Sequence, residues 1–180
     1  MSTIQAEAKI FNIGSLTLLR LPQEASAQLP SRGMTMVVGT LNEYQFQAAL
    51  EPDGKGSHWL HVDEKMLKAT KASVGDFVTL AVEPSEVWPD PELPEDLRYA
   101  LAADPQVQAV WTDITPMARW DWIRWIRATT HPQTRHRRIE VACSKLKAGK
   151  RRPCCFNRTA CTVASVSRNG VLLEPAVELN

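Results

Sequence analysis

The chain has 180 residues, of which 44% are hydrophobic, and its 21 Lys and Arg residues nearly balance 20 Asp and Glu residues. This size can support one large domain or two small ones with a real hydrophobic core. No apolar run is long enough to cross a membrane, and the N-terminus lacks the basic flank and apolar stretch of a signal peptide. We therefore expect a cytoplasmic protein. Its four cysteines lack the spacing of a secreted disulfide framework, so we expect reduced thiols.

Charge is distributed unevenly along this nearly neutral chain. Residues 119–158 contain twelve Lys or Arg residues and only two acidic residues, whereas the remainder contains nine basic and eighteen acidic residues. This asymmetry predicts either an anionic partner or an acidic surface of the same molecule that the basic block covers. It does not indicate a reaction, and the sequence contains no strongly specific nucleophile motif, phosphate loop or metal-ligand set.

Short alternating segments in the first half predict a small β-barrel. Asp63 is a good N-cap for a short helix between two of these segments, and Pro22 opens another short turn or helix. About six strands with one or two helices are typical of a closed or half-closed barrel. The expected strands cover residues 4–10, a run from residue 16, 34–41, 44–50, 59–62 and 77–82.

Proline and N-cap signals organise the second half into helices. Four prolines within eleven residues predict a stiff linker over 84–93. Helices are expected after Pro94, Asp104-Pro105, Thr115-Pro116 and His131-Pro132, the last ending at Gly149.

The tail is expected to close with a hairpin. Asn169-Gly170 lies between the apolar runs 161–166 and 171–173, and Asn-Gly between such runs is a strong hairpin signal. The predicted fold class is therefore α+β, with four parts along the chain. These are a barrel over 1–83, a linker over 84–93, a helical basic unit over 94–152, and a cysteine-containing tail with a hairpin over 153–180.

Several short motifs resemble a known protein family. In the first half they are SRGM (31–34), VGT (38–40), GKGSH (54–58) and VGDFV (74–78). In the second half they are WI (125–126), TR (134–135), RI (138–139), Leu146 and GKR (149–151).

Together these motifs resemble the YdeI/OmpD-associated (bacteriocin-protection) proteins, which carry an N-terminal small barrel domain of unknown function. The resemblance covers roughly residues 3–158. It implies a double-split barrel followed by helices and a link to bacteriocin or envelope-stress protection, but it implies no known reaction. Asn42-Glu43 replaces the Asn-Gly often found at that hairpin, so we expect a longer or looser turn here.

The helix from residue 116 is expected to carry a binding surface. At about 100° per residue it buries Trp122 and the neighbouring isoleucines, which leaves Trp120, Arg124 and Arg127 together on the opposite side. Two guanidinium groups beside an indole can pair with phosphates and stack on a base. The alternative is that Trp120 packs against the barrel or the preceding helices, with the arginines lining a domain interface.

The next helix adds two kinds of basic residue. Arg138 and Lys145 are expected on its solvated flank beside Arg137. Arg135 falls at the edge of the apolar stripe, so we expect a salt bridge to an acidic residue of the barrel or the linker. Its functional alternative is a clamp for a ligand carboxylate or phosphate.

Lys150, Arg151 and Arg152 crowd the end of that helix, where the helix dipole favours cations without any partner. Cys154 and Cys155 lie beside these charges, which favour the reactive thiolate, but the spacing of a redox or zinc motif is lacking.

We therefore expect a non-catalytic binding module for an anionic partner such as nucleic acid or a phosphate-bearing ligand, with no metal and no cofactor. The alternative is a small-molecule-binding protein or enzyme with a pocket between barrel and helices, using Arg135, His58 or His61. We do not expect His58 and His61 to bind one metal ion together, because residues three apart on a strand point to opposite faces. Gly54-Lys55-Gly56-Ser57 is interpreted as a β-turn, since a phosphate loop would lead into a helix.

Overall fold

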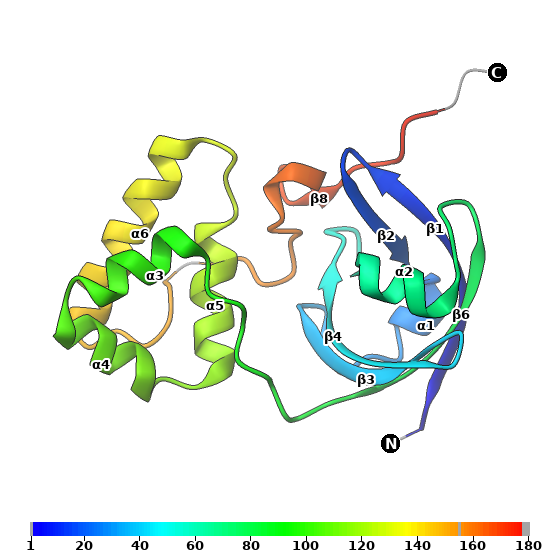
Figure 1. The fold of residues 1–180 in the computed structure, drawn as a ribbon, viewed down its shortest axis with the longest axis horizontal. Helices are drawn as coiled ribbons and strands as arrows, with labels where there is room; N and C mark the ends of the chain where they lie inside the picture. Colours follow the sequence, from blue (N-terminus) through cyan, green and yellow to red (C-terminus); the bar gives the residue numbers. More distant parts are fainter. Residues whose placement is uncertain (1, 155, 178–180) are drawn as a thin grey trace. The chain divides into compact units, whose positions relative to one another are not determined.

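The structure is a computed structural model that describes residues 2–154 and 156–177. Internal contacts divide the chain into two compact units (Figure 1). The barrel unit comprises the chain up to Val87, Arg158–Cys161 and the residues from Val166 onward. The helical unit comprises Trp88–Asn157 and Thr162–Ser165. The chain thus returns to the barrel unit after completing the helices.

Six antiparallel strands close into a barrel in the order β1-β2-β5-β4-β3-β6, which confirms the predicted fold class. Closure pairs the first strand with the last, so the barrel has no unpaired long edge. The strands are β1 (Ile4–Ile13), β2 (Leu16–Arg20), β3 (Thr35–Leu41), β4 (Tyr44–Pro52), β5 (His58–His61) and β6 (Phe77–Pro84). Two short helices accompany them, α1 (Gln23–Ser26) and α2 (Glu64–Thr70).

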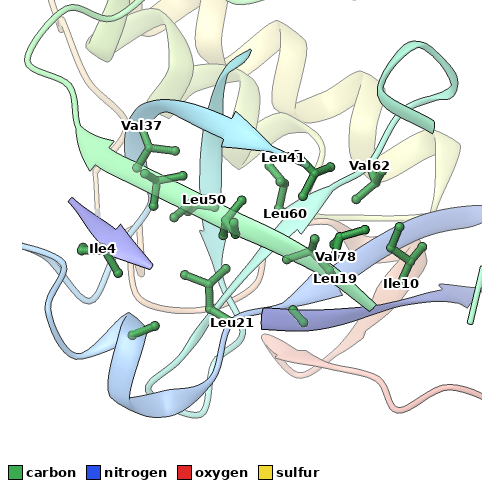
Figure 2. Packing of buried hydrophobic residues seen from close by; sticks show 14 of the residues in the cluster. Ile4, Ile10, Leu19, Leu21, Val37, Leu41, Leu50, Leu60, Val62 and Val78 are labelled. Atoms are coloured by element: carbon green, nitrogen blue, oxygen red, sulfur yellow. The ribbon is translucent and has the colours of Figure 1, made fainter. Parts of the chain in front are cut away.

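The barrel interior is filled by aliphatic side chains from every strand (Figure 2). Leu19 of β2 pairs with Leu60 of β5, which in turn pairs with Leu50 of β4, and all three are fully buried. Side chains alternate between the two faces of a strand. The residues next to these leucines therefore project from the outer face of the barrel.

The hairpin between β3 and β4 is tight, which corrects the expectation of a longer or looser turn. Leu41 pairs directly with Tyr44, so only Asn42 and Glu43 connect the strands. Both residues have positive φ, 44° and 71°, as a two-residue type I′ turn requires. Asn42 is further held by its side-chain oxygen, which accepts a hydrogen bond from the Thr79 amide at 2.8 Å.

The helical unit contains four α-helices at the positions that the N-cap and proline signals predict. Pro105, Pro116 and Pro132 each begin a helix, where their missing N–H group costs nothing. The Asp104 side chain caps the helix that begins at Pro105, and the Thr115 side chain caps the helix that begins at Pro116. The helices are α3 (Glu95–Ala102), α4 (Pro105–Asp113), α5 (Pro116–Ile126) and α6 (Pro132–Lys147), packed around a core of their own.

The proline-rich segment is attached to helix α5 over part of its length. The Trp120 indole donates a hydrogen bond to the Pro89 carbonyl at 2.9 Å, and the Trp88 ring packs edge-on against Trp120. Arg119 forms an ion pair with Asp90. These contacts place the segment from Trp88 onward in the helical unit.

The C-terminal hairpin is present but shorter than expected. Asn169 and Gly170 adopt positive φ between β7 (Ser167–Arg168) and β8 (Val171–Leu172). Residues 161–166 do not form the expected strand, because a 3-10 turn over Ala164–Val166 replaces its second half. The hairpin belongs to the barrel unit, where the Leu172 amide donates to the Asp53 carbonyl at 2.8 Å.

Candidate anion-binding surface

The nine residues expected to bind an anion do not form one exposed surface. Most of them have partners within the helical unit. Arg138 and Lys145 of α6 are half-buried, and neither has a carboxylate partner among the described residues. The nine are Trp120, Arg124, Arg127, Arg135, Arg138, Lys145, Lys150, Arg151 and Arg152.

Arg124 is buried, which corrects the expectation that it lies exposed beside Trp120 and Arg127. Its exposed fraction is 1%, its guanidinium lies 3.9 Å from the Asp121 carboxylate, and it stacks over the Phe156 ring at 5.1 Å. The expectation treated α5 as a helix with one buried stripe. Instead α5 is enclosed around most of its circumference, so the side opposite Trp122 is covered as well.

Trp120 is half-buried rather than open for stacking on a base. Its indole N–H is already used by the Pro89 carbonyl, and its ring contacts Trp88 at a centroid distance of 6.4 Å. Trp120 therefore packs within the protein, but against the proline-rich segment rather than against the barrel or a preceding helix. Arg127, at the end of α5, is half-buried and also has interaction partners.

Arg135 forms the salt bridge expected of it, but with a residue of another element. Its Nε and Nη2 atoms lie 2.7 and 2.9 Å from the two carboxylate oxygens of Asp96. Asp96 belongs to α3 rather than to the barrel or the linker. The hydrogen bonds from Arg135 lower the pKa of Asp96, and the same contact raises the pKa of Arg135.

The cations near the end of α6 also meet carboxylates of the helical unit. Arg151 lies 2.9 Å from Asp113, Arg152 lies 3.4 Å from Asp121, and Lys147 lies 2.9 Å from Asp104. The basic block therefore does cover acidic groups of the same molecule. Those groups lie in the helical unit itself, on α3, α4 and α5 and between the helices.

A cationic strip on α6 remains after this pairing. Arg137, Arg138 and Lys145 lie on one side of the helix, and we call these three residues the α6 basic flank. Among the described residues, no carboxylate lies within ion-pair distance of any of the three. The one acidic residue of α6, Glu140, instead faces His136 at 3.2 Å.

The α6 basic flank is anchored to α5 by its middle member. Arg138 donates a hydrogen bond to the Trp125 carbonyl at 2.8 Å and lies over the Trp125 ring at 5.5 Å. Its position is therefore fixed while its positive charge is not neutralised by a carboxylate. Sequence reasoning placed Arg137 beside this flank but left it out of the site. Lys150 is exposed beyond the helix end and has no described ion-pair partner.

The candidate histidines of the barrel unit do not form a metal site. His58 is fully buried and its Nε2 atom donates to the Gly33 carbonyl at 2.8 Å, so its Nδ1 atom accepts from the Ser26 hydroxyl at 2.7 Å. His61 is exposed, as expected for a residue on the opposite face. No group of three or more potential metal ligands occurs in the described part of the chain.

The glycine-rich segment before His58 is a turn, in agreement with the β-turn interpretation. The Asp53 side chain accepts hydrogen bonds from the amides of Lys55 and Ser57 at 2.7 and 2.9 Å. These amides would have to face a phosphate in a phosphate loop. Their use by Asp53 instead fixes the connection between β4 and β5.

The described cysteines form no disulfide with one another. Cys143 is half-buried, and burial raises the pKa of its thiol. Cys154 is exposed and Cys161 is buried. The remaining cysteine, Cys155, lies outside the described residues, so the expectation of a reactive Cys154 and Cys155 pair stays a prediction.

Comparison with known proteins agrees with this two-unit organisation. Residues 2–82 match the model of a domain of unknown function, DUF1905, and residues 90–149 match the model described as "Bacteriocin-protection, YdeI or OmpD-Associated". No curated protein matches the chain significantly. Within residues 2–154 and 156–177, no helix is long and apolar enough to span a membrane. The two matches lie one after the other along the barrel and helical units, and the chain belongs to the YdeI/OmpD-associated (bacteriocin-protection) family with an N-terminal DUF1905 domain.

Proposed function

We propose that this protein is a non-catalytic, cytoplasmic binding module that uses the α6 basic flank to contact the phosphate backbone of a nucleic acid. The observation that carries the proposal is the absence of any described carboxylate partner for Arg137, Arg138 and Lys145. Most cations of the basic block are used inside the helical unit. In the α6 basic flank, Arg137 is exposed and Arg138 and Lys145 are half-buried, and none of the three has a carboxylate partner among the described residues.

The charge of the helical unit supports the same proposal. It contains twelve Lys or Arg residues and eight Asp or Glu residues, so it stays positive after internal pairing. Arg138 and Lys145 are seven residues apart, about two helical turns, so they form a strip along α6, and Arg137 lies next to this strip. A helix with such a strip can follow a run of phosphates, and each contact releases condensed counterions.

Trp125 contributes rigidity rather than a base-stacking platform in this proposal. Its ring is covered by the Arg138 guanidinium on one side and contacts Trp122 at 6.1 Å edge-on. A contact made mainly by cations on phosphates carries little sequence information. We therefore expect binding with weak sequence preference and a strong dependence on salt concentration.

The test is the salt dependence of binding to short fluorescent single-stranded and double-stranded oligonucleotides. The double variant Arg137→Gln, Lys145→Gln should reduce the slope of log affinity against log salt by about two units for a duplex. The matched control is Lys65→Gln, Lys68→Gln on α2, which removes the same charge from the barrel unit. The proposal is ruled out if neither the single-stranded nor the double-stranded oligonucleotide binds at low salt. It is also ruled out if the Lys65→Gln, Lys68→Gln control reduces the salt slope by the same amount.

A further inference from the structure

A row of three polar residues crosses the outer face of the barrel. Arg20 of β2 is paired with Trp59 of β5, and Trp59 is paired with Glu51 of β4. Directly opposed residues of antiparallel strands project from the same face and lie within reach of one another. Trp59 is 1% exposed and Glu51 is also buried, so these two side chains are covered although they lie outside the barrel core. The Arg20 side chain is 28% exposed.

The row contains hydrogen-bond donors that no described residue satisfies. The indole Nε1 of Trp59 is buried without an acceptor among the described residues, and so are Nε and Nη2 of Arg20. The nearest carboxylate oxygen of Asp53 lies 3.8 Å from Arg20 Nε, which is an ion pair but too long for a hydrogen bond. Nε and Nη2 form the side-on edge of the guanidinium, which binds a carboxylate through two parallel hydrogen bonds.

The remaining nitrogen of Arg20 already binds a carboxylate. Its Nη1 atom donates to Oε1 of Glu174 at 3.0 Å, and Lys55 Nζ lies 3.6 Å from the same oxygen. The Glu174 side chain is 60% exposed, and Pro175, Ala176 and Val177 after it are exposed as well. Glu174 therefore acts as a tethered carboxylate at the rim of the row, held by contacts that solvent weakens.

We propose that Arg20, Lys55 and Trp59 form a binding site for the carboxylate group of a ligand, and that Glu174 occupies the rim of this site in the same chain. A ligand carboxylate that replaces Glu174 takes its place at Nη1 of Arg20 and beside Lys55. The buried Nε and Nη2 of Arg20 and the Trp59 indole N–H belong to the same row and lack an acceptor among the described residues. This site lies in the barrel unit and does not depend on the α6 basic flank.

Local charge favours a monoanion over a phosphate. Arg20 and Lys55 supply two positive charges, and Asp53 and Glu51 place two negative charges beside them. Exchange of Glu174 for another carboxylate leaves the charge of the site unchanged. A phosphate dianion would add a negative charge next to Asp53, which costs electrostatic free energy.

The test follows the Trp59 indole N–H resonance by NMR during titration of the full chain with acetate. Sodium chloride at the same ionic strength is the control, and the Trp59→Phe variant assigns the resonance. We expect a saturable shift with acetate alone. Glu174→Gln should bind acetate about tenfold more tightly than the unmodified chain, because it removes a competitor whose effective concentration is in the millimolar range.

Two further variants separate the site from a general charge effect. Arg20→Lys keeps the positive charge but loses the side-on edge, and it should abolish the saturable shift. Lys55→Gln lies on the exposed β4–β5 turn, where it leaves the fold intact, and it should weaken acetate binding several-fold. The proposal is overturned if the Trp59 resonance of Glu174→Gln does not respond to acetate, responds equally to chloride, or responds unchanged in Arg20→Lys.

Discussion

Arg135 binds Asp96 side-on, with Nε and Nη2 each within 2.9 Å of a different carboxylate oxygen. The pair joins α6 to α3 across 39 residues of sequence. Arg135 could have bound a ligand carboxylate or phosphate, but it binds a carboxylate of the neighbouring helix α3 instead. The other clearly paired cations follow the same pattern with Asp104, Asp113 and Asp121.

Arg135→Met should lower the free energy of unfolding by about 1 kcal/mol, since the pair is bidentate but partly exposed to solvent. Asp96→Asn should have a similar effect, and the double variant should cost little more than either single one. Urea denaturation measures all three. Arg137→Met is the matched control, and a loss of stability there as large as in Arg135→Met would contradict the assignment.

Arg124→Met should destabilise the helical unit more strongly, by about 3 kcal/mol, because the guanidinium and its Asp121 partner are both buried. Thermal unfolding monitored by tryptophan fluorescence provides the measurement. A variant as stable as the unmodified chain would show that Arg124 is not held in the interior.

Acid should destabilise the barrel unit through His58. Burial lowers the pKa of His58 in the folded protein, so below pH 6.5 the unfolded chain binds the proton more readily. Stability is therefore complete above about pH 6.5 and falls as the pH decreases toward the folded-state pKa. Partial desolvation also lowers the pKa of His61, but its side chain is exposed, so we attribute the pH dependence to the fully buried His58.

Comparison of urea denaturation at pH 5 and pH 7 tests this prediction. His58→Gln can replace both ring hydrogen bonds, and it should be less stable at pH 7 but lose less stability on acidification. His136→Gln, at an exposed position on α6, should leave the pH dependence unchanged. An equally steep pH dependence in His58→Gln would exclude His58 as its source.

Gly39→Ala should prevent normal closure of the barrel between β3 and β6. A Cβ atom at Gly39 would lie 2.1 Å from the Ala81 carbonyl oxygen and 2.8 Å from the Val82 Cα, both backbone atoms of the paired strand. We expect a loss of more than about 3 kcal/mol or failure to fold, as for severe overpacking. Gly14→Ala is the control, since nothing lies near its Cβ and only the positive φ costs about 1 kcal/mol.

The local elements of this protein follow from short stretches of its sequence. Alternation predicts the barrel strands, and proline with an N-cap residue predicts where α4 and α5 begin. Asn169-Gly170 predicts the C-terminal turn. These signals work because each depends on backbone conformation and capping within a few residues. The sequence predicts a longer or looser turn at Asn42-Glu43, whereas the turn is tight because barrel pairing holds Glu43 at positive φ despite its side chain.

The pairing and exposure of the charged residues depend instead on how distant segments pack together. Helical periodicity suggested that Arg124 is exposed, but packing around α5 buries it. The partner of Arg135 could not be chosen from sequence, because Asp96 is one of many carboxylates and only helix packing brings it close. The outer row from Arg20 to Glu51 likewise exists only through strand register across β2, β5 and β4. A charge is a property of the residue, whereas its pairing and exposure depend on segments far away in the chain.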